Sequence, residues 1–129
     1  MVTISTLTQI GLWLLALGAV LGWPIALRHI SPNALGRLGI TSPKRVLQAH
    51  IDFIMMGIIL IAVGAAVPAL PTWIAVSLAF GAIVNPLLFL PLAFRESWSK
   101  ALPYQAASII SFTAMSIGTV AAAWHATTL

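Results

Sequence analysis

The sequence predicts an all-α protein, an integral membrane four-helix bundle that forms one domain over residues 1–129. Two features of the composition lead to this prediction. Hydrophobic residues make up 60% of the chain and charged residues only 6%, whereas roughly a quarter of the residues of a soluble domain are charged. Four long apolar segments also follow one another, and about 20 such residues in a helix cross about 30 Å of hydrocarbon. The lipid bilayer is therefore the first expected partner.

Each of the four segments is predicted to be a helix rather than a strand, because it is continuous and rich in Ala and Leu. The strands of a membrane barrel would instead alternate over about 10 residues. The second span has a clear start, since Ser42 can cap a helix whose first residue is Pro43. The uncharged segment between the second and third spans predicts a tight hairpin. The predicted spans cover residues 4–27, 43–67, 72–94 and 102–125.

Basic residues gather in the first and third predicted loops, and the hairpin between them carries no charge. Loops rich in Lys and Arg remain on the cytoplasmic side of a membrane. We therefore expect both loops in the cytoplasm and both termini outside, in a bacterial inner membrane. The net charge of +4 is explained by this orientation, and no nucleic-acid partner is expected. The basic residues are Arg28, Arg37, Lys44 and Arg45 around the first loop, and Arg95 and Lys100 in the third.

His50 is the first polar residue inside a predicted span, about 10 Å from the start of its helix. It shares a helix face with Leu47, Phe53, Ile54 and Gly57. An imidazole among apolar side chains is typical of a haem axial ligand, and the glycine leaves room for a flat ring. A hydrogen bond from His50 to a neighbouring helix explains the same residue more simply, and both explanations stay open. A zinc or di-iron cluster is not expected, because no second histidine follows at i+3 or i+4.

Asp52 and Asn85 are the other polar residues within the second and third spans. Asp52 points about 200° away from His50 around the helix and shares its face with Gln48 and Arg45. This placement predicts a polar ladder that ends at the cytoplasm, and a proton relay is the alternative, since an ionisable group in a span is often functional. Asn85, which precedes a proline, can satisfy a freed carbonyl, bridge two helices or point its amide at a ligand.

The second and third spans together resemble the styrene oxide isomerase family. The resemblance covers about half of the chain, chiefly residues 45–94. It depends on the spacing of residue types that are individually common. The shared features are Ala49 and His50, Gly57 at seven residues after the histidine, Pro68 and Leu70 from eighteen residues after it, and Asn85 with the aromatic Phe89 four residues later.

This resemblance implies a homotrimer of four-helix protomers with haem b bound between neighbouring subunits. It also implies redox-neutral chemistry, in which ferric iron acts as a Lewis acid and a small hydrophobic epoxide is isomerised to an aldehyde. The family's axial histidine falls on His50, which is the expected iron ligand. We expect Gly57 to contact the cofactor and Asn85 to be the catalytic residue of the substrate pocket.

Three polar residues of that family are replaced here by residues without a polar side chain. Met56 stands where the family has Asn, Phe89 where it has Tyr, and Gly81 where it has Asp. If the iron alone is sufficient, the chain is an isomerase with a more apolar substrate. If those polar groups are required, the chain is a non-enzymatic b-type haem carrier or sensor. A structural subunit of a membrane complex, without cofactor, is the remaining alternative.

Overall fold

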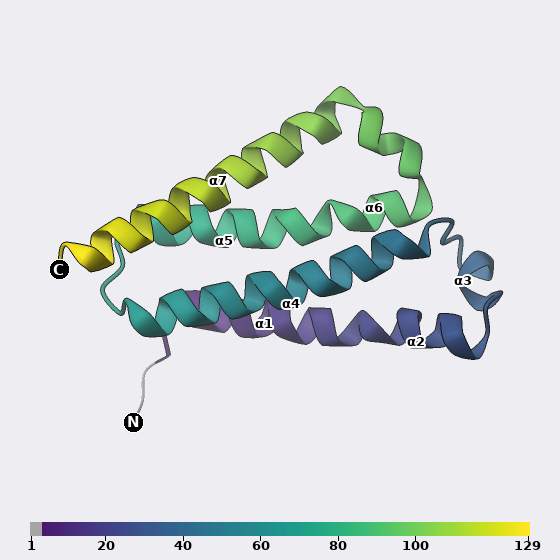
Figure 1. The fold of residues 1–129 in the computed structure, drawn as a ribbon, viewed down its shortest axis with the longest axis horizontal. Helices are drawn as coiled ribbons and strands as arrows, with labels where there is room; N and C mark the ends of the chain where they lie inside the picture. The colour runs from purple at the N-terminus through teal and green to yellow at the C-terminus, as the bar shows by residue number, and fades with distance from the viewer. Residues whose placement is uncertain (1–3) are drawn as a thin grey trace.

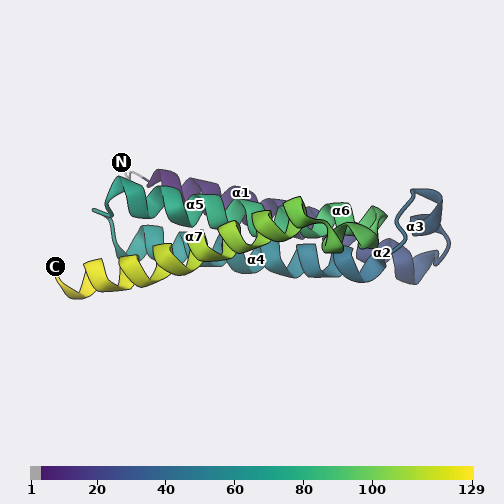
Figure 2. The same cartoon turned by 90° about the horizontal axis from the view of Figure 1, so that it is seen from above.

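The computed structural model describes residues 4–129, which form helices and connecting turns with no strand among them. Four helical segments are long and apolar enough to cross a membrane, and they run side by side along one axis (Figures 1 and 2). The predicted all-α four-helix bundle is therefore confirmed. In chain order the elements are α1 (Thr6–Val20), α2 (Gly22–Ile30), α3 (Ala34–Arg37), α4 (Pro43–Ala66), α5 (Thr72–Leu87), α6 (Phe89–Phe94), the 3-10 helix η1 (Glu96–Lys100) and α7 (Leu102–Thr127).

The two ends of the bundle differ in charge. The end that holds the start of α1, the end of α7 and the loop of residues 67–71 is called here the hairpin end (Figure 1). The opposite end, called the basic end, holds α3, η1 and the connections around them. All six Lys and Arg residues of the chain lie at or near the basic end. This asymmetry is the one on which the predicted orientation depends.

Prolines divide the first and third spans into two helices each. Pro24 has no N–H to donate to the carbonyl of Val20, and α1 ends at that residue. Pro91 likewise cannot donate to Leu87, the last residue of α5. Pro86, in contrast, lies inside α5 without ending it. The first span was expected to be a single helix, and the missing donor explains the difference.

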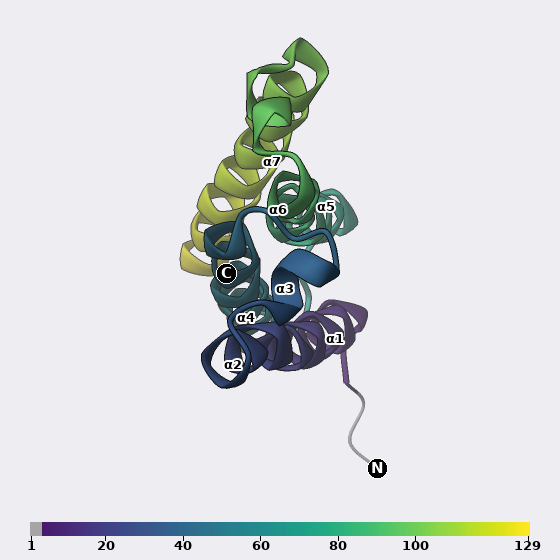
Figure 3. The same ribbon diagram turned by 90° about the vertical axis from the view of Figure 1, so that its right-hand side faces the viewer.

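Two pairs of helices, α1 with α4 and α5 with α7, pack through glycines (Figure 3). A Cβ atom placed on Gly57 would lie 2.7 Å from the carbonyl oxygen of Gly11 and 2.8 Å from the backbone nitrogen of Leu15. In the second pair, a Cβ atom on Gly81 would lie 2.9 Å from the backbone nitrogen of Met115. Small residues allow backbones to touch in this way in membrane helices.

The first and third loops are joined at the basic end. The helix α4 begins at Pro43 as predicted, but the Ser42 side chain makes no capping bond. Instead the backbone N–H groups of Thr41 and Ser42 donate to the carbonyl of Ala93 in α6, at 2.8 and 3.0 Å. An ion pair between Arg45 Nε and Glu96 Oε1, 3.1 Å apart, adds a second link. These contacts fix the start of α4, from which both His50 and Asp52 project.

Candidate functional site

His50 lies on the side of α4 that faces α1 and α2. Its Nδ1 is 2.5 Å from the carbonyl oxygen of Gly18, and the ring fills the space beside Gly22, where an added Cβ atom would be 3.3 Å from Cε1. The hydrogen bond to a neighbouring helix, expected as the simpler explanation of His50, is therefore present. Because a carbonyl only accepts, Nδ1 carries the proton and Nε2 the lone pair. Nε2 has no hydrogen-bond partner within residues 4–129.

This arrangement of His50 fits an iron ligand. Histidines that bind a metal usually donate their other ring N–H to a carboxylate or a backbone carbonyl, which fixes the tautomer and the ring orientation. The Gly18 carbonyl occupies that position here. Within residues 4–129, no three His, Cys, Asp or Glu side chains lie together in a group that could hold a metal ion, but haem needs only an axial side chain.

Gly57 does not offer the open space that a flat ligand needs, so its expected contact with the cofactor is corrected. Gly57 is buried where α4 packs against α1. The backbone of α1, at Gly11 and Leu15, occupies the place of its missing side chain. Gly57 is therefore a contact residue between helices, and within residues 4–129 the glycine that lies next to the His50 ring is Gly22.

A second set of polar residues surrounds a cavity of about 190 Å³ between α4, the α5–α6 junction and α7. Its lining residues come from the half of the bundle nearer the basic end. Figure 1 shows that α7 diverges from α5 in that half. The cavity combines one acid, one amide and two hydroxyl groups with apolar walls. Its lining residues are Asp52, Met56, Asn85, Leu88, Phe89, Tyr104, Ser108 and Phe112.

Asp52 belongs to this cavity and not to the expected polar ladder. The ladder itself is present without it, because Arg45 Nη1 donates to Gln48 Oε1 at 2.9 Å and Arg45 Nε pairs with Glu96. No hydrogen bond or salt bridge joins Asp52 to another residue in the described part of the chain. The half-buried carboxyl group of Asp52 instead borders the cavity from α4.

Asn85 bridges α5 and α7, which was one of its three expected roles. The hydroxyl group of Ser111, a fully buried residue, donates to Asn85 Oδ1. The two N–H groups of the same amide have no hydrogen-bond partner within residues 4–129 and remain available to a ligand in the cavity. Bridging and ligand binding are therefore compatible, since they use different atoms of the side chain.

Replacing Ser111 with alanine is expected to lower the free energy of unfolding by about 1–3 kcal/mol, because buried Asn85 Oδ1 loses its donor. The matched control is Ser116→Ala, which removes an exposed hydroxyl group from the same helix. Titration with sodium dodecyl sulfate, followed by circular dichroism in detergent micelles, measures both values. Equal stability of the two variants would contradict the bridge between α5 and α7.

Within one protomer, His50 and Asn85 do not meet. His50 faces α1 and α2, whereas the cavity is lined by residues on the other side of α4 and by α5, α6 and α7. Figure 3 shows α1 and α2 on one side of α4 and α5 and α7 on the other. Asn85 is brought together with Asp52 and with Met56 and Phe89, two of the positions at which the chain departs from the isomerase family. Gly81, the third such position, packs against α7 at Met115 and does not line the cavity.

Tyr104 and Ser108 are cavity residues that were not expected from the sequence. The Tyr104 hydroxyl group donates to the carbonyl of Leu88 at 2.7 Å, at the junction of α5 and α6. Ser108 Oγ donates to the carbonyl of Tyr104 at 3.0 Å, within its own helix. Together with Ser111 they form a polar stripe at helical spacing along α7, and this spacing is the signal that identifies them.

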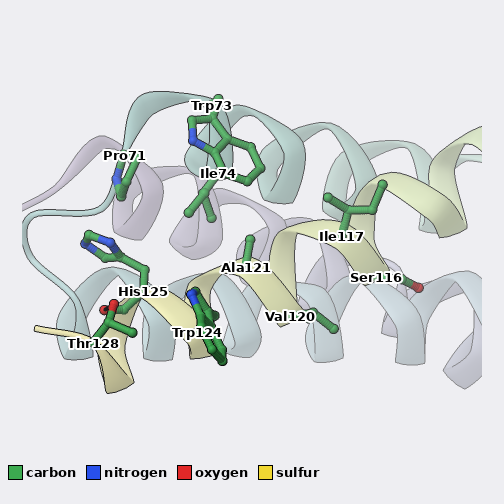
Figure 4. Close-up of a pocket in the computed structure, with 10 residues that line it drawn as sticks. All are labelled: Pro71, Trp73, Ile74, Ser116, Ile117, Val120, Ala121, Trp124, His125 and Thr128. Atoms are coloured by element: carbon green, nitrogen blue, oxygen red, sulfur yellow. Dashed lines mark hydrogen bonds between the residues drawn. The ribbon is translucent and has the colours of Figure 1, made fainter.

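A larger hollow of about 690 Å³ lies at the hairpin end, between the start of α5 and the end of α7 (Figure 4). It is mostly apolar, and its exposed Trp73 and Trp124 are typical of the headgroup level of a membrane. His125 borders it, with a buried Nε2 that has no hydrogen-bond partner within residues 4–129. No acid and no second ionisable side chain accompanies His125 among the lining residues, so this groove lacks the groups for acid–base chemistry.

Comparison of the chain with protein-family models, with curated proteins and with solved structures finds no match.

Proposed function

We propose that the chain binds haem b through Nε2 of His50 and isomerises a small hydrophobic epoxide to an aldehyde without net redox change. The observation that supports this proposal is the hydrogen bond from Nδ1 to Gly18, which orients the ring and leaves Nε2 with its lone pair unpartnered. Ferric haem, when bound, supplies a Lewis acid for the epoxide oxygen. His50 would be the side chain that holds the iron, and a single protein ligand would suit a catalyst better than an electron carrier.

The residues around the cavity bind and orient the substrate in this proposal. The free N–H groups of Asn85 donate to the substrate oxygen, while Met56, Phe89 and Phe112 contact its hydrocarbon part. A cavity inside an apolar bundle also keeps water away from the opening epoxide, which would otherwise be hydrolysed to a diol. Specificity for apolar substrates follows from the replacement of polar family residues by Met56 and Phe89.

Two copies of the chain must contribute to one site. Since His50 and Asn85 lie on opposite sides of α4, one protomer cannot present both to the same substrate. We therefore propose a homotrimer, in which His50 of one protomer faces the cavity of the next. Exposed apolar side chains on the first half of α7, such as Ile109 and Phe112, offer surface for this contact. The basic end lies in the cytoplasm of a bacterial inner membrane by the distribution of Lys and Arg.

Protein loaded with ferric haem is expected to convert styrene oxide to phenylacetaldehyde, with no added oxidant or reductant and no diol. Gas chromatography measures the product, and reduction of the sample with dithionite is expected to change the rate, because the ferrous ion is a weaker Lewis acid. If the protein binds haem but forms no product from a panel of aryl and alkyl epoxides, the isomerase proposal is wrong. The remaining interpretation is then a haem carrier or sensor. If the protein takes up no haem, the remaining interpretation is a structural subunit of a membrane complex.

A further inference from the structure

We propose that Asp52 is a further catalytic residue, whose carboxylate stabilises the positive charge that develops on a substrate carbon when the epoxide ring opens. This role rests on the proposed isomerisation. The placement of Asp52 in the cavity with Asn85 and Tyr104 does not depend on it. The position of Asp52 differs from all three positions at which the family carries polar residues that this chain has lost.

The surroundings of Asp52 give it no structural role. It is one of two acids in the 129 residues, and it sits inside a membrane span, where an ionisable side chain is costly and usually functional. Arg45, the basic residue nearest along its helix face, is already bonded to Gln48 and Glu96. No described residue forms a salt bridge with Asp52. Its carboxyl group is therefore free to act on a molecule in the cavity.

The polar groups of the cavity divide into one free donor, the amide of Asn85, and one carboxyl group, that of Asp52. The hydroxyl protons of Tyr104 and Ser108 are used in bonds to backbone carbonyls. Asn85 keeps its two amide N–H groups, since its oxygen accepts from Ser111. Donors suit the oxygen of an opening epoxide, which becomes negative, and a carboxylate suits the carbon, which becomes positive. In a site without water such charge interactions are strong.

The reaction is balanced within the substrate. The bond between oxygen and the more substituted carbon breaks, and its electron pair goes to oxygen. A hydride then moves with its electron pair from the carbon that still bears oxygen to the positive carbon, and the carbon–oxygen double bond forms. Nothing is oxidised or reduced overall, and no proton enters or leaves. Asp52 contributes only charge, so it is neither consumed nor covalently modified.

Asp52→Asn tests this role, because it removes the charge and keeps the shape of the side chain. We expect kcat for styrene oxide to fall by about 100-fold, as for the loss of one electrostatic contact to a transition state, with KM and haem content unchanged. Ser116→Ala, which removes an exposed hydroxyl group that does not line the cavity, is the control and is expected to keep the wild-type kcat. Asp52→Glu, which retains the charge, is expected to recover most of the activity.

The dependence of the rate on substituents of the phenyl ring distinguishes an electrostatic role of Asp52 from a purely structural one, because a structural role would leave this dependence unchanged. Without the carboxylate, the positive carbon depends more on the ring, so the rate should fall more steeply from para-methyl to para-nitro styrene oxide in Asp52→Asn than in wild type. If the wild type is active and Asp52→Asn is equally active, or shows the same substituent effect as the wild type, the proposed role of Asp52 is wrong. The proposed isomerisation would still stand. Inactive wild type with bound haem would overturn the proposed function and this role with it. If Asp52→Asn does not fold, Asp52→Ser carries the same comparison.

Discussion

Alanine in place of His50 is expected to abolish haem binding and to leave the four-helix fold intact. Wild-type protein mixed with haem should show a strong Soret band after gel filtration, and His50→Ala should show none. The variant loses the lone pair of Nε2 and one hydrogen bond to Gly18, and a typical hydrogen bond contributes only about 0.5–1.5 kcal/mol to stability. Gel filtration and far-ultraviolet circular dichroism in detergent check that the fold remains.

The other two histidines provide matched controls for the haem experiment. His29 is exposed near the end of α2, and His125 lies at the hairpin end of α7. His29→Ala and His125→Ala are both expected to keep the Soret band. A band that survives His50→Ala and disappears in His125→Ala would move the ligand to the unpartnered Nε2 of His125. Wild type that remains colourless with added haem would reject the cofactor altogether.

Leucine in place of Gly57 is expected to separate α1 from α4 and to destabilise the bundle severely. The new side chain would begin 2.7 Å from the Gly11 carbonyl oxygen and 2.8 Å from the Leu15 nitrogen, and both are backbone atoms that move only with the whole helix. Inserting smaller volumes into a packed core costs about 1–3 kcal/mol, and a whole leucine at a backbone contact should exceed that range. Titration with sodium dodecyl sulfate, followed by circular dichroism, measures the loss.

Gly36→Ala is the control for this experiment, because a Cβ atom at Gly36 in α3 would meet no heavy atom within 4 Å. Its stability should match that of wild type or exceed it slightly. Gly57→Leu should also weaken haem binding, since Gly18, which orients His50, belongs to the displaced helix. A Gly57→Leu variant as stable as wild type would show that α1 and α4 do not meet at Gly57.

The spans could be predicted from the sequence because length and hydropathy do not depend on how the helices pack. The second and fourth predicted spans agree with α4 (Pro43–Ala66) and α7 (Leu102–Thr127) to within two residues at each end. The division of the first span at Val20 was missed, although Pro24 and its missing donor are local features. The short helix α3 (Ala34–Arg37), which is followed two residues later by Gly39 with a φ of 84°, was also missed.

The candidate site could be predicted only in part, since its residues come from helices whose neighbours the sequence does not reveal. Helical spacing correctly separates Asp52 from His50, but it cannot say which helix covers either face. The same limit explains the wrong expectation for Gly57, because a glycine marks a close approach without naming what approaches. Tyr104 and Ser108 line the cavity only because α7 packs against α5.

The glycine contact between α1 and α4 affects the order in which the helices assemble, because both helices are synthesised before α5 and α7. Both partners of that contact lie before residue 67, so this pair can assemble in the membrane while α5 and α7 are still being synthesised. During that interval Asp52, on the uncovered side of α4, is exposed to lipid at a free-energy cost. Arrival of the second pair covers the carboxyl group, so the residue that lines the cavity also favours completion of the fold.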